Sequence, residues 1–187
     1  RGAFEQAWHV SLDAEPGMRI PNMLAAAVAG EFHGMFIQGE DIAQSDPNTL
    51  HVTQALSAMD CVVVQDLFLN ETAKYAHVFL PGTAFLEKDG TFTNTERRIN
   101  RVRPVMPPKT GLSEWEAVCR LATAMGYDMS YANAAEIMNE IAALTPTFAG
   151  VSFAHLDRVG SVQWPCTADH PLGTRIMHEE KFVRGKG

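Results

Sequence analysis

The sequence has few cysteines, and their spacing argues against two kinds of small-protein scaffold. Only Cys61, Cys119 and Cys166 are present, and they are far apart. There is no Cys-x-x-Cys pair and no Cys/His ligand spacing, so neither a structural zinc site nor a disulfide framework is indicated. Cys61 opens a run of valines and is expected to be a small buried hydrophobic residue. Unpaired cysteines favour a cytoplasmic protein.

Long apolar runs and excess positive charge are also missing. No run approaches the about 20 apolar residues of a membrane-spanning helix, and the opening residues do not resemble a signal peptide. The net charge of -7 argues against a nucleic-acid binder, because phosphate contacts need a basic face. The chain opens on Arg1 rather than Met and ends at Gly187 without a closing element, so we expect a segment of a longer polypeptide.

Familiar glycine and nucleophile motifs are absent as well. Neither G-x-G-x-x-G nor G-x-x-x-x-G-K-[ST] occurs, so an ordinary dinucleotide fingerprint or P-loop is not supported. The seven histidines are scattered, and none stands with a Ser or Cys in a recognisable nucleophile motif. Triad chemistry therefore has little support.

What the sequence does contain is three short apolar runs that end in polar or turn-forming residues. Residues 35–38, 61–64 and 77–80 are such runs, and they lead into Gly39-Glu40-Asp41, Gln65-Asp66 and Pro81-Gly82. Short apolar runs bounded by turn signals predict buried strands of a parallel sheet. Ligands of open α/β sheets bind outside the carboxyl ends of the strands. The pattern therefore favours a nucleotide site at one edge of the sheet.

Helix signals separate these runs. An Ala-rich helix is predicted over 22–29, and Asp46-Pro47 predicts the cap and first residue of a helix that runs to about Met59. Asn70 predicts a short helix through Lys74. This βαβαβ order predicts an α/β fold: a Rossmann-like, doubly wound, mostly parallel sheet with helices on both faces.

The second half of the chain has weaker strand signals and two strong helix starts. Residues 91–94 and 98–103 are predicted to be extended. A capping box at Ser113 predicts a helix that ends at residue 126, and Asn133 predicts another through Leu144. From residue 145 onward the chain is expected to form a loop-rich tail.

Four residues at the predicted strand ends are candidates for ligand binding. Asp41 and Asp66 offer oxygens that accept hydrogen bonds from ribose hydroxyls or a guanine edge. Turn chemistry explains either acid equally well, although the presence of both favours the functional interpretation. Gly39 and Gly82 allow a ligand close to the backbone, and a plain turn role is slightly favoured for Gly82.

Three further features have open interpretations. Ser45 is either a phosphate donor near a helix N-terminus or a loop hydroxyl. Glu114 lies in the first turn of a capped helix, where the helix dipole stabilises a carboxylate without a ligand, and this structural role is favoured. The basic cluster of residues 96–98, Arg101 and Arg103 either pairs with phosphates or a partner's carboxylates, or is a solvated edge strand.

Several motifs resemble the molybdopterin oxidoreductase family. They are 37–41 (IQGED), 64–68 (VQDLF) and 72–82 (TAKYAHVFLPG). The most specific stretch is 87–99 (EKDGTFTNTERRI). Together with Gly126-Tyr127 and 163–166 (QWPC), it is similar to the large (alpha) subunit of formate dehydrogenases, of the soluble NAD-linked type.

The resemblance implies a bis(molybdopterin guanine dinucleotide) cofactor carrying molybdenum or tungsten. Such subunits oxidise formate to carbon dioxide and pass electrons through iron–sulfur clusters to NAD, with iron–sulfur and flavin subunits as partners. Residues 1–145 would be part of a Rossmann-like cofactor domain, and 146–187 would lead to a C-terminal domain of the catalytic subunit.

The resemblance also implies roles for individual residues. Gly39, Asp41 and Ser45, with Gln65 and Asp66, would lie at the nucleotide end of the cofactor. Gly82, where relatives can carry Ser, would lie close to the cofactor, and Glu114 matches an acidic position that can be Asp. The metal-ligating Cys or selenocysteine, its His and the Cys-rich cluster segment match nothing here. We therefore expect no catalytic or metal-ligating residue in this chain, and no activity from the chain alone.

Two alternatives remain at this stage. The large iron–sulfur subunit of respiratory NADH dehydrogenase uses a similar domain as a scaffold without molybdenum. Nitrate reductase is a sister oxidoreductase of the same family. The intact Gly-Glu-Asp and Gln-Asp strand ends favour a domain that binds its dinucleotide.

Overall fold

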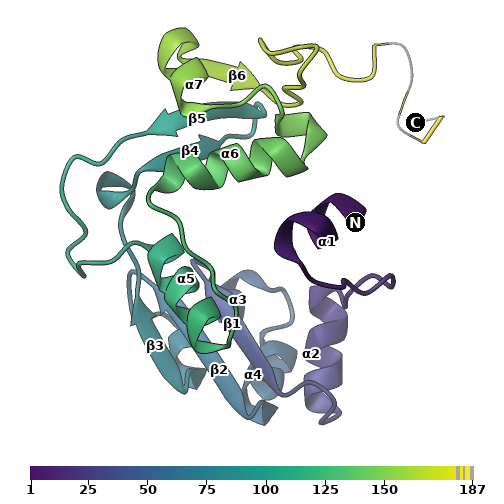
Figure 1. Cartoon of the computed structure of the whole chain (residues 1–187). Coiled ribbons are helices and arrows are strands. Elements are labelled where there is room, and N and C mark those ends of the chain that lie inside the picture. The colour runs from purple at the N-terminus through teal and green to yellow at the C-terminus, as the bar shows by residue number, and fades with distance from the viewer. Residues whose placement is uncertain (180–181, 183, 186–187) are drawn as a thin grey trace. The chain divides into compact units, whose positions relative to one another are not determined.

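The computed structural model describes residues 1–179, 182, 184 and 185 (Figure 1). They form two compact units, each with its own sheet and core. The parallel-sheet unit comprises residues 11–84 and 108–114. The antiparallel-sheet unit comprises residues 1–10, 85–107 and 115–187.

Three parallel strands form the first sheet. They are β1 (Gly34–Gln38), β2 (Cys61–Asp66) and β3 (Val78–Pro81), in the order β1-β2-β3. Gln38 stands opposite Gln65, and Asp66 stands opposite Pro81. The predicted parallel sheet is confirmed, and each predicted strand start lies within one residue of the observed one.

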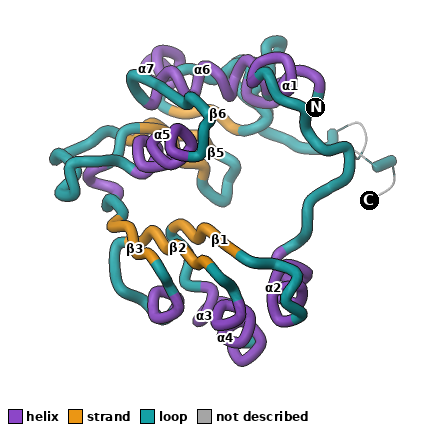
Figure 2. Tube along the Cα trace, turned by 60° about the horizontal axis from the view of Figure 1, so that its bottom comes forward, coloured by secondary structure: helices purple, strands orange, loops and turns teal. Residues whose placement is uncertain are grey.

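Helices pack on this sheet through apolar residues at helical spacing. The elements are α2 (Ile20–Val28), α3 (Ile42–Ser45), α4 (Thr49–Ala58) and the 3-10 helix η1 (Thr72–Tyr75). Leu24 of α2 and Leu56 of α4 are buried in one core with Val64 of β2. Figure 2 shows α2, α3 and α4 along the same side of the sheet. The α/β class is confirmed, whereas helical cover of the second face stays a prediction.

Two local predictions in this unit are wrong. Helix α4 is capped by Asn48, whose Oδ1 accepts from the His51 amide, and not by Asp46. The Asp46 carboxylate accepts from the Asn48 amide at 2.8 Å, so it closes a turn before the helix begins. Cys61 is exposed, because it is the first residue of β2 and lies ahead of the buried part of the strand.

The second sheet is antiparallel. Its strands are β4 (Gly90–Thr93), β5 (Arg98–Val102) and β6 (Ser161–Gln163), in the order β4-β5-β6. The helices of this part of the chain are α1 (Gly2–Trp8), η2 (Phe85–Glu87), α5 (Glu114–Ala124), α6 (Ala134–Leu144), η3 (Pro146–Phe148) and α7 (Phe153–Val159).

The segment beyond residue 145 is more ordered than the predicted loop-rich tail. It contributes α7 and β6, and Val162 of β6 pairs with Ile99 of β5. Both residues are buried with Leu156 of α7 in the core of this unit. The strand is only three residues long, so its pattern was too short to stand out from loop sequence.

Helix α6 is tied to α1 and to the preceding loop by one carboxylate. Trp8 Nε1 donates to Glu140 Oε1 at 2.8 Å, and the Tyr131 hydroxyl donates to Glu140 Oε2 at 2.8 Å. Burial, together with this carboxylate, raises the pKa of Tyr131 to about 12. The phenol is therefore a donor throughout the neutral range.

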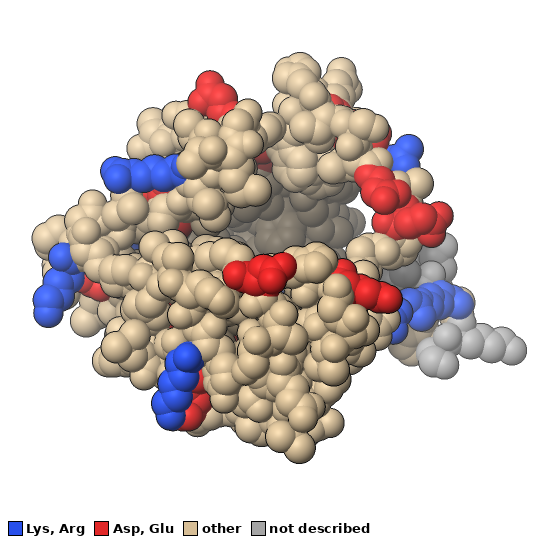
Figure 3. Space-filling model, turned by 90° about the horizontal axis from the view of Figure 1, so that it is seen from below, with Lys and Arg blue, Asp and Glu red and all other residues tan. Residues whose placement is uncertain are grey.

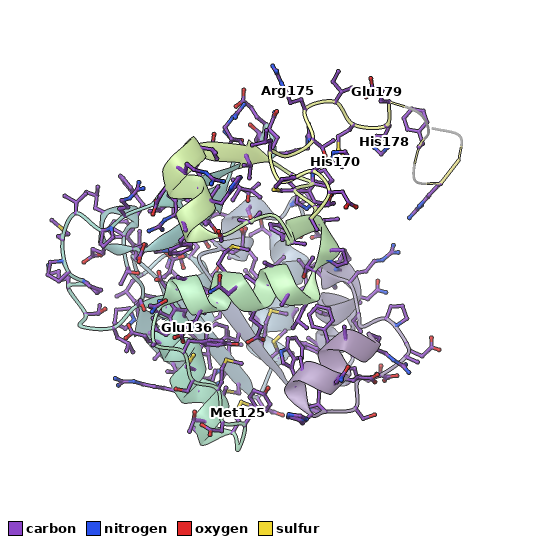
Figure 4. The ribbon with its side chains drawn as sticks, turned by 45° about the horizontal axis from the view of Figure 1, so that its top comes forward. Met125, Glu136, His170, Arg175, His178 and Glu179 are labelled. Carbon is purple, nitrogen blue, oxygen red and sulfur yellow. The ribbon has the colours of Figure 1, made fainter. Side chains whose placement is uncertain are left out.

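The start of α6 confirms the predicted cap. Asn133 Oδ1 accepts from the amides of Ala135 and Glu136, and Glu136 Oε2 accepts from the Ala132 amide at 2.7 Å. Figure 4 shows Glu136 at this end of the helix. The reciprocal pair satisfies amides that the helix itself leaves without acceptors.

Replacing Asn133 by alanine is expected to destabilise the antiparallel-sheet unit by about 1 kcal/mol, because the first-turn amides lose their acceptor. Amide exchange of α6 in the full-length protein measures this loss of stability. Asn139→Ala, an exposed position on the same helix, is the control and should be neutral. Equal effects of both changes would contradict the capping role.

Among the described residues, no helix is both long and apolar enough to cross a bilayer.

Candidate functional site

The carboxyl ends of the three parallel strands lie side by side. The Gly39 amide donates to the Gln65 carbonyl at 2.9 Å, and the Gly82 amide donates to the Asp66 carbonyl at 2.8 Å. Strand pairing thus continues one residue past β1 and past β3. We call the residues gathered here, Gly39, Asp41, Gln65, Asp66 and Gly82, the carboxyl edge.

Gln65 of the carboxyl edge is hydrogen-bonded to Gln38, the last residue of β1. Gln65 is only 2% exposed, and Gln38 Nε2 donates to its Oε1 at 2.9 Å. The next residue, Gly39, has a φ of 63°, a left-handed conformation that glycine adopts without strain. The chain therefore leaves β1 in a sharp turn, and among the described residues no atom outside residues 38–40 lies within 4 Å of where a Cβ at Gly39 would be.

Asp66 organises the turn that follows β2. Its Oδ1 accepts from the Leu67 amide at 2.6 Å, and its Oδ2 accepts from Asn70 Nδ2 at 2.9 Å. Asn70 Oδ1 in turn accepts from the Ala73 amide at 2.9 Å, at the start of η1. Because an ionised carboxylate has about four lone-pair sites, Asp66 retains acceptor capacity beyond these two bonds.

Asp41 is held by the loop between β2 and β3. Its Oδ1 accepts from both the amide (3.0 Å) and the hydroxyl (2.6 Å) of Thr72. The Glu71 amide approaches Oδ2 at 3.4 Å. Burial would raise the pKa of Asp41, but these hydrogen bonds and the charge of Lys74 outweigh it, so the pKa lies below its usual value. Asp41 is therefore a fixed anion at neutral pH.

Ser45 does not lie at a helix N-terminus. It is the last residue of α3, three residues before the Asn48 cap of α4, and its hydroxyl donates to Glu40 Oε1. The argument for a phosphate contact through a helix N-terminus is wrong for Ser45, because α4 begins later than expected. Its role at the nucleotide end rests on the resemblance alone.

Glu114 is joined to the residue that follows Gly82. The Thr83 amide donates to Glu114 Oε1 at 2.9 Å, and the Thr83 hydroxyl donates to Oε2. A Cβ at Gly82 would lie 3.2 Å from the Asp66 carbonyl carbon and 3.5 Å from Glu114 Oε1. The backbone at Gly82 is thus closely packed on one side, and a side chain there would need a small local shift.

Two of the four arginines in the basic cluster are structural, and the edge-strand interpretation is wrong. β5 is the central strand of its sheet, and the Arg101 side chain is 9% exposed. Arg97 donates to the carbonyls of Trp164, Thr174 and Arg175. Two of these guanidinium groups therefore hold the fold, and Figure 3 shows no continuous basic patch on the face it presents.

Sequence reasoning missed the small residues that hold the carboxyl edge together. Thr72 and Thr83 are buried, and Asn70 bridges Asp66 to η1. A signal was available, since each follows a strand end within a few residues and is a type that bonds nearby backbone. Among the described residues, no three His, Cys, Asp or Glu side chains are grouped to hold a metal ion.

Comparison with known proteins identifies the family of this chain. Residues 3–124 match the molybdopterin oxidoreductase family. The chain belongs to that family. It is 40% identical over 187 residues to the F420-dependent formate dehydrogenase subunit alpha of Methanocaldococcus jannaschii, an alignment that covers 98% of this chain and 28% of the relative.

Two further proteins are similar to this chain, one in sequence and one in fold. A putative formate dehydrogenase of Staphylococcus aureus is 42% identical over 185 residues, covering 97% of this chain and 18% of the relative. The acetylene hydratase from Pelobacter acetylenicus has a similar fold, with a TM-score of 0.63 at 20% identity over 87% of this chain and 23% of its own. This molybdopterin oxidoreductase chain thus spans 28% or less of the length of these proteins.

The carboxyl edge offers acceptor oxygens and open backbone to a ligand that donates hydrogen bonds. A guanosine presents ring N–H donors and ribose hydroxyls, and the edge presents carboxylate oxygens at Asp41 and Asp66. Open backbone at Gly39 lets a planar group approach. These residues would bind and orient such a group.

Proposed function

We propose that this chain is part of a formate dehydrogenase catalytic subunit and binds one guanine dinucleotide arm of a bis(molybdopterin guanine dinucleotide) cofactor. The observation that carries the proposal is the meeting of Asp66, Gln65 and Gly82 at neighbouring strand ends. Parallel sheets bind ligands at this edge. The relatives named formate dehydrogenase support formate as the substrate.

The chain's own residues act by binding and orientation. Asp66 accepts hydrogen bonds from the nucleotide, Gln65 and Asp41 contribute further polar contacts, and Gly39 and Gly82 permit a close approach. The resemblance favours Ser45 as a further contact at the nucleotide end and Glu114 as a contact to the cofactor. When bound, the cofactor's molybdenum or tungsten supplies the two-electron oxidation of formate, as expected where a cofactor carries the chemistry.

The surrounding protein is also part of the proposal. Residues 1–145 belong to a cofactor domain, and 146–187 lead to further parts of the same subunit. Iron–sulfur and flavin subunits in the cytoplasm carry electrons to NAD. Relatives named F420-dependent favour F420 as a second candidate acceptor.

Analysis of the purified full-length protein tests the proposal. We expect molybdenum or tungsten by mass spectrometry, two equivalents of guanine nucleotide after acid hydrolysis, and formate-dependent reduction of a viologen dye. Parallel assays with NAD and F420 identify the acceptor. Iron without molybdenum or tungsten would instead identify a scaffold of the NADH dehydrogenase type, and nitrate turnover without formate turnover would identify a sister enzyme.

A further inference from the structure

We propose that Thr72 is a positioning residue of the nucleotide site and acts by holding the Asp41 carboxylate in place. The proposal rests on the proposed function, since it assumes that the carboxyl edge binds the guanine nucleotide. Thr72 lies in the connection between β2 and β3, and Asp41 follows β1.

The buried Thr72 side chain both donates and accepts a hydrogen bond. This side chain is 0% exposed. Its hydroxyl donates to Asp41 Oδ1 at 2.6 Å, and the hydroxyl oxygen of Thr72 accepts from the Ala43 amide at 3.0 Å. Buried polar groups are almost always paired in this way. The hydroxyl therefore joins two loops that are distant in sequence and fixes both ends of the Asp41–Ala43 turn.

The two carboxylate oxygens of Asp41 accept hydrogen bonds of unequal number and length. Oδ1 accepts bonds of 2.6 and 3.0 Å from Thr72, whereas Oδ2 has, among the described residues, the Glu71 amide at 3.4 Å, near the limit for a hydrogen bond. Oδ2 thus keeps most of its acceptor capacity while Oδ1 anchors the group. A ligand that donates to Oδ2 meets a carboxylate that is already oriented, so binding does not have to order it.

The neighbouring charges do not compete for this role. Lys74, the nearby cation, is bound to Glu71 through contacts of 2.6 and 2.5 Å on the surface. Glu40 is engaged by Ser45. The orientation of Asp41 is therefore set by a neutral hydroxyl and backbone amides.

Thr72→Val in the full-length, cofactor-loaded protein tests the inference, because valine keeps the shape and removes the hydroxyl. We expect the dissociation rate of guanine nucleotide-bearing cofactor to rise by about tenfold, the usual effect of one hydrogen bond to a charged group. Thr72→Ser restores the hydroxyl and should restore slow dissociation. The Thr53 hydroxyl bonds the Leu50 carbonyl on α4, so Thr53→Val is the matched control and should not change the dissociation rate.

A double-variant comparison separates positioning from simple stabilisation. If Thr72 acts through Asp41, adding Thr72→Val to Asp41→Ala will not speed dissociation further. Additive effects, or a lower melting temperature with unchanged dissociation, would overturn the inference. If Asp41→Ala and Asp66→Ala both leave the nucleotide content unchanged, the carboxyl edge is not the nucleotide site, and the proposed function fails separately.

Discussion

Asp66→Ala in the full-length protein is expected to lower the bound guanine nucleotide at least about tenfold, because a charged acceptor at the strand end is lost. The parallel sheet should persist, since the side chain of Asp66 packs into no core and its ladder bonds come from the backbone. Nucleotide released by acid hydrolysis, divided by protein concentration, measures the loss. Circular dichroism confirms the retained fold.

Two comparison variants sharpen this prediction. Asp60→Ala removes an exposed acid that directly precedes β2 and pairs with His33, so it should leave the nucleotide content unchanged. Asp66→Asn keeps an acceptor for the Leu67 amide but removes the charge, so it should give an intermediate loss. Full nucleotide loading of Asp66→Ala would remove Asp66 from the site.

Arg101→Met is expected to destabilise the antiparallel-sheet unit by about 1–3 kcal/mol, the usual cost of leaving buried hydrogen-bonding groups without their partner. The guanidinium lies 3.6 Å from the centre of the Phe153 ring and 2.9 Å from Asp89 Oδ1. It also donates to the carbonyls of Gly90 and Val102. Methionine fills part of the volume but donates no hydrogen bond to these acceptors.

Amide exchange measured strand by strand gives the size of this effect. Protection of β4 and β5 should fall by about 5- to 150-fold, since local opening free energies set exchange rates. Arg103→Met is the matched control: it also loses a contact with Asp157, but its side chain is 61% exposed. That change should cost less than about 1 kcal/mol. Equal loss of protection in both variants would show that the burial of Arg101 adds nothing to its contribution to stability.

The elements with strong local signals were predictable. The three strands of the parallel sheet follow from apolar runs with turn residues at their ends, and α6 follows from the cap at Asn133. These signals depend only on near neighbours in the chain. The family could also be identified this way, because its motifs are the same strand ends and turns.

Local signals failed where two nearby interpretations competed. Asp46 and Asn48 are both good cap residues two positions apart, and only the chain path leaving α3 decides which one begins α4. Cys61 belongs to a valine-rich strand, yet its position at the start of β2 leaves it exposed. Burial depends on the depth of each residue in the sheet, which a run of apolar letters does not give.

The sequence by itself determined the parallel strands, their order along the chain and the polar residues at their ends, because these depend on local periodicity and turn chemistry. The tertiary structure alone decided which partners those residues have. Hydrogen bonds join Asp41 to Thr72 and Glu114 to Thr83, residues that are far apart in sequence. The buried Arg101 likewise contacts residues outside its own strand. Such contacts form only when the strands and loops are packed, because hydrogen bonds need their atoms within about 3 Å.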